Sequence, residues 1–343
     1  MRKGVLLPKE NPQNIIVRMP NWIGDLVMAT PILADLKAAY PHAKLTAMCQ
    51  KPLGELLKKD PHLDEIFSFH KPGSFLRRAE KRSIVQKLRQ GKYDLGVLLT
   101  NSFSSAWWFW QGRVKQRLGF ARDGRSFLLT NPIHTDKKKD RHLTTIYKEL
   151  LLPLGIKKSD TPPRLYVDDA EIKQAKETLG QLGITDAFVG INPGAAFGEA
   201  KCWLPERFAE VAKDLEEKGY SVVFFGDAKS KNLIDTICAS LPSRVLNLAG
   251  QTSLRELMAY LKLCQVLLTN DSGPMHMAVA LGTEVVALFG STSATYTGPY
   301  DLGSVIQKPV KCAPCFKRVC PIDFRCMKQI QSDEVIEILK KRL

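Results

Sequence analysis

The protein has 343 residues, of which 44% are hydrophobic and 25% charged. This length is too great for one small core and suits two domains, and the composition excludes a globally disordered chain. No apolar run approaches the roughly 20 residues of a membrane-spanning helix. The N-terminal stretch lacks the apolar core of a secretory signal, so we expect the protein to stay in the reducing cytoplasm.

The formal net charge is +15, which calls for an anionic partner. Residues 70–92 hold eight lysines and arginines against Glu80 alone, and residues 112–164 hold thirteen against five acids. These two stretches account for the whole excess. They are either solvated helix faces and loops, or a surface that meets a polyanion or a membrane. No RRM, KH, helix-turn-helix or zinc-finger spacing accompanies them, which favours an anionic lipid surface or acidic glycolipid over nucleic acid.

In chain order, the first half alternates short β-branched runs with amphipathic segments. The helix expected over residues 25–40 has apolar residues in an i, i+3, i+4 rhythm and ends before Pro41. Strands separated by helices in this way predict a doubly wound parallel α/β sheet. The expected strands are 15–19, 45–49, 65–69 and 95–99, and the other expected helices are 52–59 and 74–90.

The second half repeats this alternation. Between the halves, residues 157–163 are polar and contain two prolines, as a linker does. We therefore expect domains of residues 1–165 and 166–343, two Rossmann-like folds that face one another across a ligand-binding cleft. The expected strands are 187–191, 221–225, 245–248, 266–269 and 284–289, and the expected helices are 205–218, 229–240, one capped by Thr252, and 275–281.

The segment from Thr269 to His276, TNDSGPMH, follows an apolar strand and opens a helix at Ser272-Gly273-Pro274. The free N–H groups of a first helical turn form an anion site, and a diphosphate suits it. Asp271 and His276 lie close enough in sequence to reach the same ligand. The alternative is an N-capped core helix with a packed histidine.

A second glycine-rich connection runs from Asn192 through Gly194 and Ala195 to Lys201. Its small residues allow the backbone to approach a phosphate. Lys201 is either a positive charge that contacts this phosphate or a solvated surface lysine. The loop matches neither GxxxxGK[ST] nor GxGxxG, which argues against a P-loop NTPase and a dinucleotide oxidoreductase.

Asp25 stands in the stretch NWIGD, where the first strand leads into the first helix. An acid at a helix start is an ordinary capping choice. The carboxyl ends of strands are also where α/β proteins place ligands, and there Asp25 is a candidate general base.

Four of the eight cysteines, Cys312, Cys315, Cys320 and Cys326, lie within fifteen residues. They form either a structural zinc site or a set of reduced thiols, because a disulfide framework is disfavoured in the cytoplasm. The run from Trp107 to Trp110 precedes the second basic stretch. It is explained by buried helix packing or by an aromatic patch for sugar stacking or a membrane interface.

Together these segments resemble family 9 of the glycosyltransferases, the bacterial ADP-heptose:lipopolysaccharide heptosyltransferases. The resemblance covers essentially the whole chain. Within the family, the chain is most similar to the branch that adds the second heptose. It is carried by VRMPNWIGDLVMATPIL, INPGAAFGEAKCWLPERFAE, LLTNDSGPMHMAVALGTEVVALFGSTSATYTGP and CAPCFKRVCPIDFRCM.

The resemblance implies a GT-B fold and inverting transfer of L-glycero-D-manno-heptose from ADP-heptose to the first heptose of the lipopolysaccharide inner core. It implies that Asp25 is the catalytic base in an acceptor-side N-terminal domain. Because Lys201 and backbone N–H groups can stabilise the leaving ADP and no DxD-type cluster lies near the site, we expect no cofactor or divalent metal to be required. Ser272 stands where threonine is common in the donor-binding DxGxxH pattern. The donor-binding candidates are Asn192, Gly194, Ala195, Lys201, Asp271, Ser272, Gly273 and His276.

The resemblance also gives the basic N-terminal half a partner, a phosphate-rich lipid A–Kdo–heptose acceptor at the inner face of the cytoplasmic membrane. The protein would then be cytoplasmic and peripheral to that membrane. The alternatives are transfer to another core position or of another nucleotide sugar and, outside this class, a basic zinc-bearing nucleic-acid-binding or scaffold protein. The acceptor-binding candidates are Arg77, Arg78, Lys81, Arg82, Lys137, Lys138 and Lys139.

Overall fold

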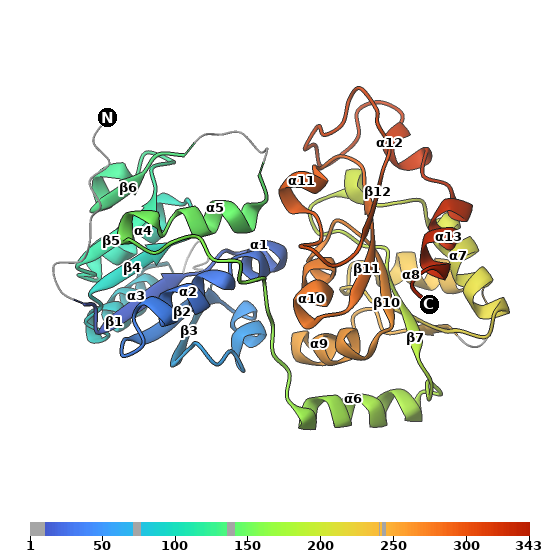
Figure 1. The fold of residues 1–343 in the computed structure, drawn as a ribbon, viewed down its shortest axis with the longest axis horizontal. Helices are drawn as coiled ribbons and strands as arrows, with labels where there is room; N and C mark the ends of the chain where they lie inside the picture. The colour runs from blue at the N-terminus through green and yellow to red at the C-terminus, as the bar shows by residue number, and fades with distance from the viewer. Residues whose placement is uncertain (1–10, 71–76, 136–140, 240, 242–244) are drawn as a thin grey trace. The chain divides into compact units, whose positions relative to one another are not determined.

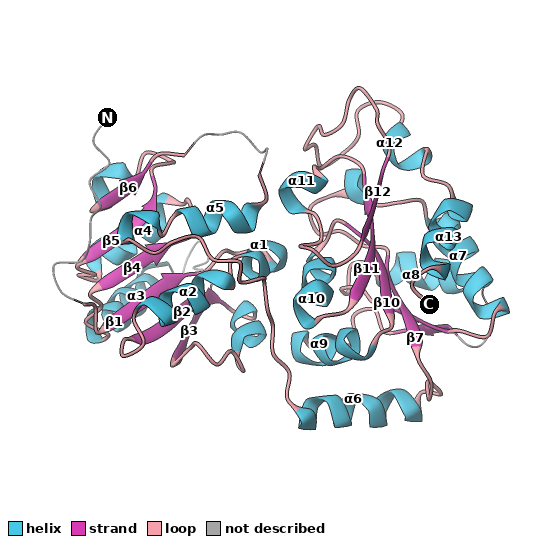
Figure 2. Ribbon diagram, in the orientation of Figure 1, coloured by secondary structure: helices cyan, strands magenta, loops and turns pink. Residues whose placement is uncertain are grey.

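A computed structural model describes residues 11–70, 77–135, 141–239, 241 and 245–343. The chain divides into two compact units, Met1–Tyr166 and Val167–Leu343, one residue from the predicted boundary (Figure 1). Each unit holds a sheet with helices packed around it (Figure 2). Among the described helices, none has the length and apolar character that a bilayer crossing requires.

The first unit is built on a six-stranded parallel sheet of order β3-β2-β1-β4-β5-β6. Its strands are β1 (Asn14–Arg18), β2 (Lys44–Gln50), β3 (Glu65–Phe69), β4 (Leu95–Leu98), β5 (Gln116–Phe120) and β6 (Asn131–Ile133). Its helices are α1 (Ile23–Met28), α2 (Pro31–Ala39), α3 (Arg77–Gln90), α4 (Phe103–Gln111) and α5 (Leu143–Glu149), with short turns η1 (Leu53–Leu57), η2 (Ser126–Leu128) and η3 (Leu152–Leu154).

The second unit repeats this topology, with the parallel order β12-β11-β10-β7-β8-β9. Its strands are β7 (Phe188–Asn192), β8 (Ser221–Phe224), β9 (Val245–Asn247), β10 (Val266–Asn270), β11 (Glu284–Phe289) and β12 (Ser304–Gln307). Its helices are α6 (Asp169–Gln181), α7 (Pro205–Glu217), α8 (Lys231–Cys238), α9 (Leu254–Leu263), α10 (Gly273–Leu281), α11 (Ala294–Thr297), α12 (Arg325–Lys328) and α13 (Ser332–Lys340), with the turn η4 (Glu199–Lys201).

This strand order fixes where each sheet can hold a ligand. The strand sequence reverses between β1 and β4 in the first sheet and between β7 and β10 in the second. In doubly wound folds, ligands bind outside the carboxyl ends of the strands at such a reversal. The loops that follow β1, β4, β7 and β10 are therefore the positions to inspect.

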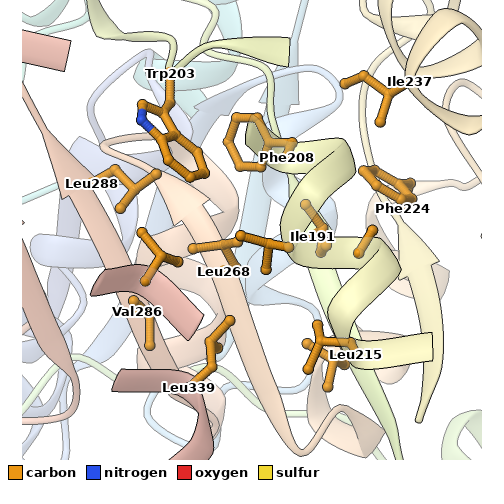
Figure 3. Packing of buried hydrophobic residues seen from close by; sticks show 14 of the residues in the cluster. Ile191, Trp203, Phe208, Leu215, Phe224, Ile237, Leu268, Val286, Leu288 and Leu339 are labelled. Carbon is orange, nitrogen blue, oxygen red and sulfur yellow. The ribbon is translucent and has the colours of Figure 1, made fainter. Parts of the chain in front are cut away.

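The second unit's core explains why its strands are almost continuously apolar. Both faces of the sheet are covered by helices, so alternate side chains have no solvent face to meet. Trp203 packs edge-on against Phe208, with ring centroids 5.0 Å apart. Figure 3 shows this cluster, which includes Ile191, Trp203, Phe208, Leu215, Phe224, Ile237, Leu268, Val286, Leu288 and Leu339.

The single helix predicted over residues 25–40 is wrong, because the structure has α1 and α2 with a break at Ala29–Thr30. Pro31 has no N–H with which to bond the carbonyl of Val27 four residues earlier. The Thr30 hydroxyl donates to that carbonyl instead, at 2.8 Å. Proline at the start of α2 then fits a position where no N–H is needed.

Two other local predictions need correction. The helix predicted over residues 52–59 is the short 3-10 turn η1. The predicted cap Thr252 is displaced by Ser253, whose hydroxyl accepts from the backbone N–H of Glu256 while the Glu256 carboxylate accepts from the Ser253 N–H. This reciprocal capping box satisfies two backbone donors, which a cap one residue earlier would leave open.

Candidate functional site

Two loops meet at the carboxyl edge of the second sheet, one after β7 and one after β10. Asn192 ends β7, and its amide nitrogen lies 3.1 Å from both the Gly194 carbonyl and the Ser272 hydroxyl. A Cβ on Gly194 would lie 2.6 Å from the Ser230 hydroxyl, so glycine permits this close approach. The structure thus brings together three of the predicted donor-site residues.

Lys201 and Asp271 form a buried ion pair at this edge. The Lys201 ammonium lies 2.6 Å from a carboxylate oxygen of Asp271, and their side chains are only 13% and 4% exposed. The same ammonium lies 3.3 Å from the Asp271 backbone carbonyl and 5.0 Å from the ring centroid of Phe197. Lys201 is therefore a fixed charge at the end of the glycine-rich loop.

The same Asp271 oxygen accepts two more hydrogen bonds, from the hydroxyls of Thr292 at 2.6 Å and Thr297 at 3.3 Å. Sequence reasoning missed both threonines. A signal was available, because Thr292 closely follows β11, whose carboxyl end lies beside that of β10. The other Asp271 oxygen lies 4.0 Å from Nε2 of buried His276. With one oxygen so fully engaged, Asp271 holds Lys201 in place.

The N-terminus of α10 opens beside this pair. Ser272 is the N-cap residue, but its side chain makes no capping bond to the helix. Its hydroxyl lies 3.0 Å from the Thr269 hydroxyl and also accepts from Asn192. The sequence left open an N-capped core helix as the alternative, but Ser272 does not cap α10 with its side chain. The first-turn N–H groups, starting at Gly273, form the positive end of the helix dipole.

The cysteine-rich segment supports the glycine-rich loop. The Arg318 carbonyl accepts from the Ala200 N–H at 2.9 Å, and the Arg318 guanidinium lies 5.4 Å from the Phe197 ring centroid. Gly198, with φ of 154°, passes so close that a Cβ would lie 2.4 Å from the Arg318 carbonyl oxygen. Ala195 lies in the same loop, and its carbonyl accepts from the Gly198 N–H at 3.3 Å.

The four cysteines of this segment are free, and burial raises the pKa of the Cys326 thiol. Across the described residues, no three His, Cys, Asp or Glu side chains form a group that could hold a metal ion. We therefore assign these thiols no metal chemistry.

In the first unit, Asp25 is the third residue of α1, directly beyond the loop that follows β1. The N-cap position belongs to Trp22, and Asp25 is the acid in the first turn of the helix. Arg18 supports the intervening loop. Its guanidinium donates to the Asn21 side chain at 2.6 Å and to the Met19 carbonyl, and its burial lowers its pKa to about 10.

The predicted acceptor-side cations are described only in part. Lys81 and Arg82 are exposed on α3, and Arg77 and Arg78 are the first two residues of this helix. The side chains of Arg77 and Arg78, and all of residues 137–139, lie outside the described residues.

Comparisons with known proteins agree on one family. The family model "Glycosyltransferase family 9 (heptosyltransferase)" matches residues 81–324. Lipopolysaccharide heptosyltransferase 2 of Salmonella typhimurium is 32% identical over 83% of this chain and 85% of its own length. Lipooligosaccharide heptosyltransferase 2 of Campylobacter jejuni is 28% identical over 96% and 98% of the two chains.

Solved structures show the same fold. The E. coli ADP-heptose lps heptosyltransferase II superposes with a TM-score of 0.83 at 28% identity, over 96% of this chain and 98% of the other. A family 9 glycosyl transferase from Veillonella parvula gives a TM-score of 0.86 at 25% identity, over 96% and 97%. The fold is therefore the predicted GT-B arrangement of two Rossmann-like α/β units, and the chain belongs to glycosyltransferase family 9, the heptosyltransferases.

Proposed function

We propose that this protein transfers L-glycero-D-manno-heptose from ADP-heptose to the first heptose of the lipopolysaccharide inner core, with inversion at the anomeric carbon. The heptosyltransferase 2 relatives support the reaction, and the name of the solved E. coli relative supports the donor. The observation that carries the proposal is the buried Lys201–Asp271 pair beside the open N-terminus of α10.

The donor diphosphate gains most from this edge of the second sheet. When the glycosidic bond breaks, negative charge develops on the departing ADP, and fixed donors stabilise it without reorganisation. The Lys201 ammonium and the first-turn N–H groups of α10 are such donors. Asp271 is a positioning residue, because its bonds to Thr292 and Thr297 hold the carboxylate that orients Lys201. With these charges in place, we propose that the reaction requires no cofactor and no divalent metal.

The acceptor hydroxyl needs a base, and Asp25 is the proposed one. A carboxylate accepts the hydroxyl proton late, as that hydroxyl becomes acidic during its attack on the anomeric carbon. Arg18 bonds Asn21 and Met19 within the loop that leads to Asp25. The base therefore stands on a braced turn and a helix, which favours precise geometry.

A lipid-linked, phosphate-rich acceptor explains the charge of the first unit. The basic helix α3, with Lys81 and Arg82 exposed, lies in this unit together with Asp25. We propose a cytoplasmic protein that contacts the inner face of the cytoplasmic membrane through this unit, where anionic headgroups attract cations. Acceptor contacts by Arg77, Arg78 and residues 137–139 remain part of the proposal.

The test is transfer from purified ADP-heptose to two acceptors, one that ends in Kdo and one that already carries the first heptose. We expect product only with the second acceptor, NMR coupling that shows inversion, and unchanged turnover after chelation of divalent ions. Transfer to the Kdo-only acceptor instead would identify the enzyme that adds the first heptose. No product with either would overturn the proposed substrate.

A further inference from the structure

Helix α4 presents two aromatic faces with different surroundings. Ala106, Trp108 and Phe109 are buried against the first unit's core. Phe103, Trp107 and Trp110, spaced at i, i+4 and i+7, share the opposite face and are exposed. The sequence left burial and an aromatic surface as alternatives for this run, and the structure shows one on each face.

The exposed rings form one continuous surface, here called the aromatic patch (Phe103, Trp107, Trp110 and Phe127). Trp107 lies 6.3 Å from Phe103 and 4.9 Å from Trp110 between ring centroids. Phe127, on η2, lies 6.0 Å from Phe103. The four side chains are between 37% and 74% exposed. Contiguous exposed apolar surface of this kind marks a binding face.

The patch is rigidly supported by a buried arginine. Arg125 is fully buried, donates to the Phe120 carbonyl at 3.1 Å and also bonds the Thr100 carbonyl. These bonds tie the loop before α4 to the turn η2, so the two segments that carry the patch are held together. A preformed surface loses less conformational entropy on binding.

Positive charge predominates around the patch, although Asp123 is exposed between Arg122 and Phe127. Between Asp94 and Asp123 the chain contains four cations and no acid. Arg113 is exposed directly after α4, and Arg122 is exposed shortly before Phe127. Arg89 of α3 donates to the Gln111 carbonyl at 2.9 Å, which places the basic helix against the end of α4.

The patch also begins at the functional edge of its sheet. Phe103 follows the loop after β4, and Asp25 follows the loop after the neighbouring parallel strand β1. Both loops leave the carboxyl edge at the point where the strand order reverses. A surface that held the aromatic patch would therefore also hold the end of the sheet that carries the proposed base.

We propose that the aromatic patch docks on the anionic surface of a phospholipid bilayer, its rings entering the headgroup region and the surrounding cations meeting lipid phosphates. Tryptophan rings favour the boundary between hydrocarbon and water, and nearby cations add attraction to anionic lipid. A protein partner of ordinary composition would not require such an excess of cations over acids. The proposal deepens the proposed function, because a lipid-linked acceptor brings the enzyme to that surface.

The test measures binding of the full chain to vesicles of phosphatidylethanolamine and phosphatidylglycerol in equal parts, with phosphatidylcholine vesicles for comparison. We expect binding to the anionic vesicles and quenching of tryptophan fluorescence by brominated lipid. The Trp107→Ser/Trp110→Ser double variant should lower the partition coefficient by roughly tenfold. Its residual binding should vanish at high salt, because only the cations remain.

Leu182→Ser is the matched control, since Leu182 in the second unit is 46% exposed against 48% for Trp110. It should bind vesicles like the wild type. The double variant should also transfer heptose normally to a deacylated, water-soluble acceptor. If the wild type lacks that soluble activity, the proposed function fails while the vesicle result stands.

Three results would overturn membrane docking. The wild type could fail to bind anionic vesicles, for example because two copies associate through the patch and cover it. The double variant could bind vesicles as tightly as the wild type. It could instead raise KM for the soluble acceptor, which would assign the patch to sugar stacking.

Discussion

The two units share one strand order and differ in the charge they carry. Residues 1–166 hold thirty lysines and arginines against fourteen acids, whereas residues 167–343 hold twenty against twenty-one. In the first, basic unit, the loop at the strand reversal leads to an acid, Asp25. In the second, nearly neutral unit, the same position holds Lys201 and the N-terminus of α10. The sheet therefore determines where a site forms, and the loops determine its chemistry.

Buried cations follow the same division. In the first unit, Arg18 and Arg125 bond backbone carbonyls, and burial lowers the pKa of each to about 10. In the second, Lys201 and Arg255 pair with the carboxylates of Asp271 and Glu171. The arginines of the first unit hold loops in shape. The pairs of the second unit place charge where a ligand or a helix end uses it.

Removal of the proposed base should have the largest effect. Asp25→Asn keeps the side chain's shape but cannot accept the hydroxyl proton, so kcat should fall by about a thousandfold. ADP affinity, measured by calorimetry, should be unchanged because the proposed donor site lies in the other unit. Asp123→Asn is the control, an exposed acid of the same unit outside the proposed chemistry. Near-normal turnover of Asp25→Asn would remove Asp25 from the mechanism.

Lys201→Met tests the second unit's site in both activity and stability. It should lower kcat/KM by about a hundredfold, because the departing diphosphate loses a fixed cation. It should also lower the free energy of unfolding by about 3 kcal/mol, since Asp271 is left buried without its counterion. Urea denaturation of Lys231→Met, whose pair with Asp235 is exposed, should show a change of under about 0.5 kcal/mol. Equal losses would mean that burial of the Lys201 pair adds nothing.

The sequence predicted the sheets better than the contacts between distant loops. Strand and helix periodicity located β3 and β11 to the residue, and most other predicted strands within one residue. It missed β5, β6 and β12. Strand β5 begins with the polar residues Gln116 and Arg117, so it does not read as an apolar run. Strand β6 has three residues and contains Pro132, which argues against a strand except at a sheet edge, where β6 lies.

The sequence named candidate site residues by their type but did not predict how they pair. Lys201 and Asp271 were each expected to face a ligand, yet they bind one another across 70 positions of sequence. No local sequence pattern predicts such a pair, because its two residues lie on loops that are distant in sequence and that only the parallel sheet brings together. For residues 107–110 the sequence left burial and an exposed aromatic surface as alternatives, and only the packing of α4 shows which side chains are buried.

Gly198→Ala tests whether the cysteine-rich segment supports the donor loop. The added Cβ would lie 2.4 Å from the Arg318 carbonyl oxygen, so the loop or the segment must shift. ADP affinity should fall by about tenfold, or 1.4 kcal/mol. Gly180→Ala, a position in α6 with nothing within 4 Å of the added Cβ, should leave ADP affinity unchanged and slightly stabilise the helix. Unchanged affinity for Gly198→Ala would separate the cysteine-rich segment from donor binding.

The smallest effect concerns the ion pair at the start of α6. The Arg255 guanidinium lies 2.7 Å from Glu171, and this hydrogen bond is the main cause of that carboxyl's lowered pKa. A group whose pKa is lowered on folding contributes stability above its unfolded value of 4.5, and that contribution disappears as pH falls through the folded value. Glu171→Gln should therefore cost about 1 kcal/mol at neutral pH and progressively less in acid.

Glutamine can still complete the capping box with Asp168, so the loss in Glu171→Gln reports the ion pair and not the cap. Glu256→Gln is the matched control, because Glu256 completes the equivalent box with Ser253 on α9. The control should change stability by under about 0.5 kcal/mol at any pH, measured by urea denaturation. If both variants lost the same stability with the same pH dependence, the Arg255–Glu171 ion pair would add no stability beyond that of the capping box.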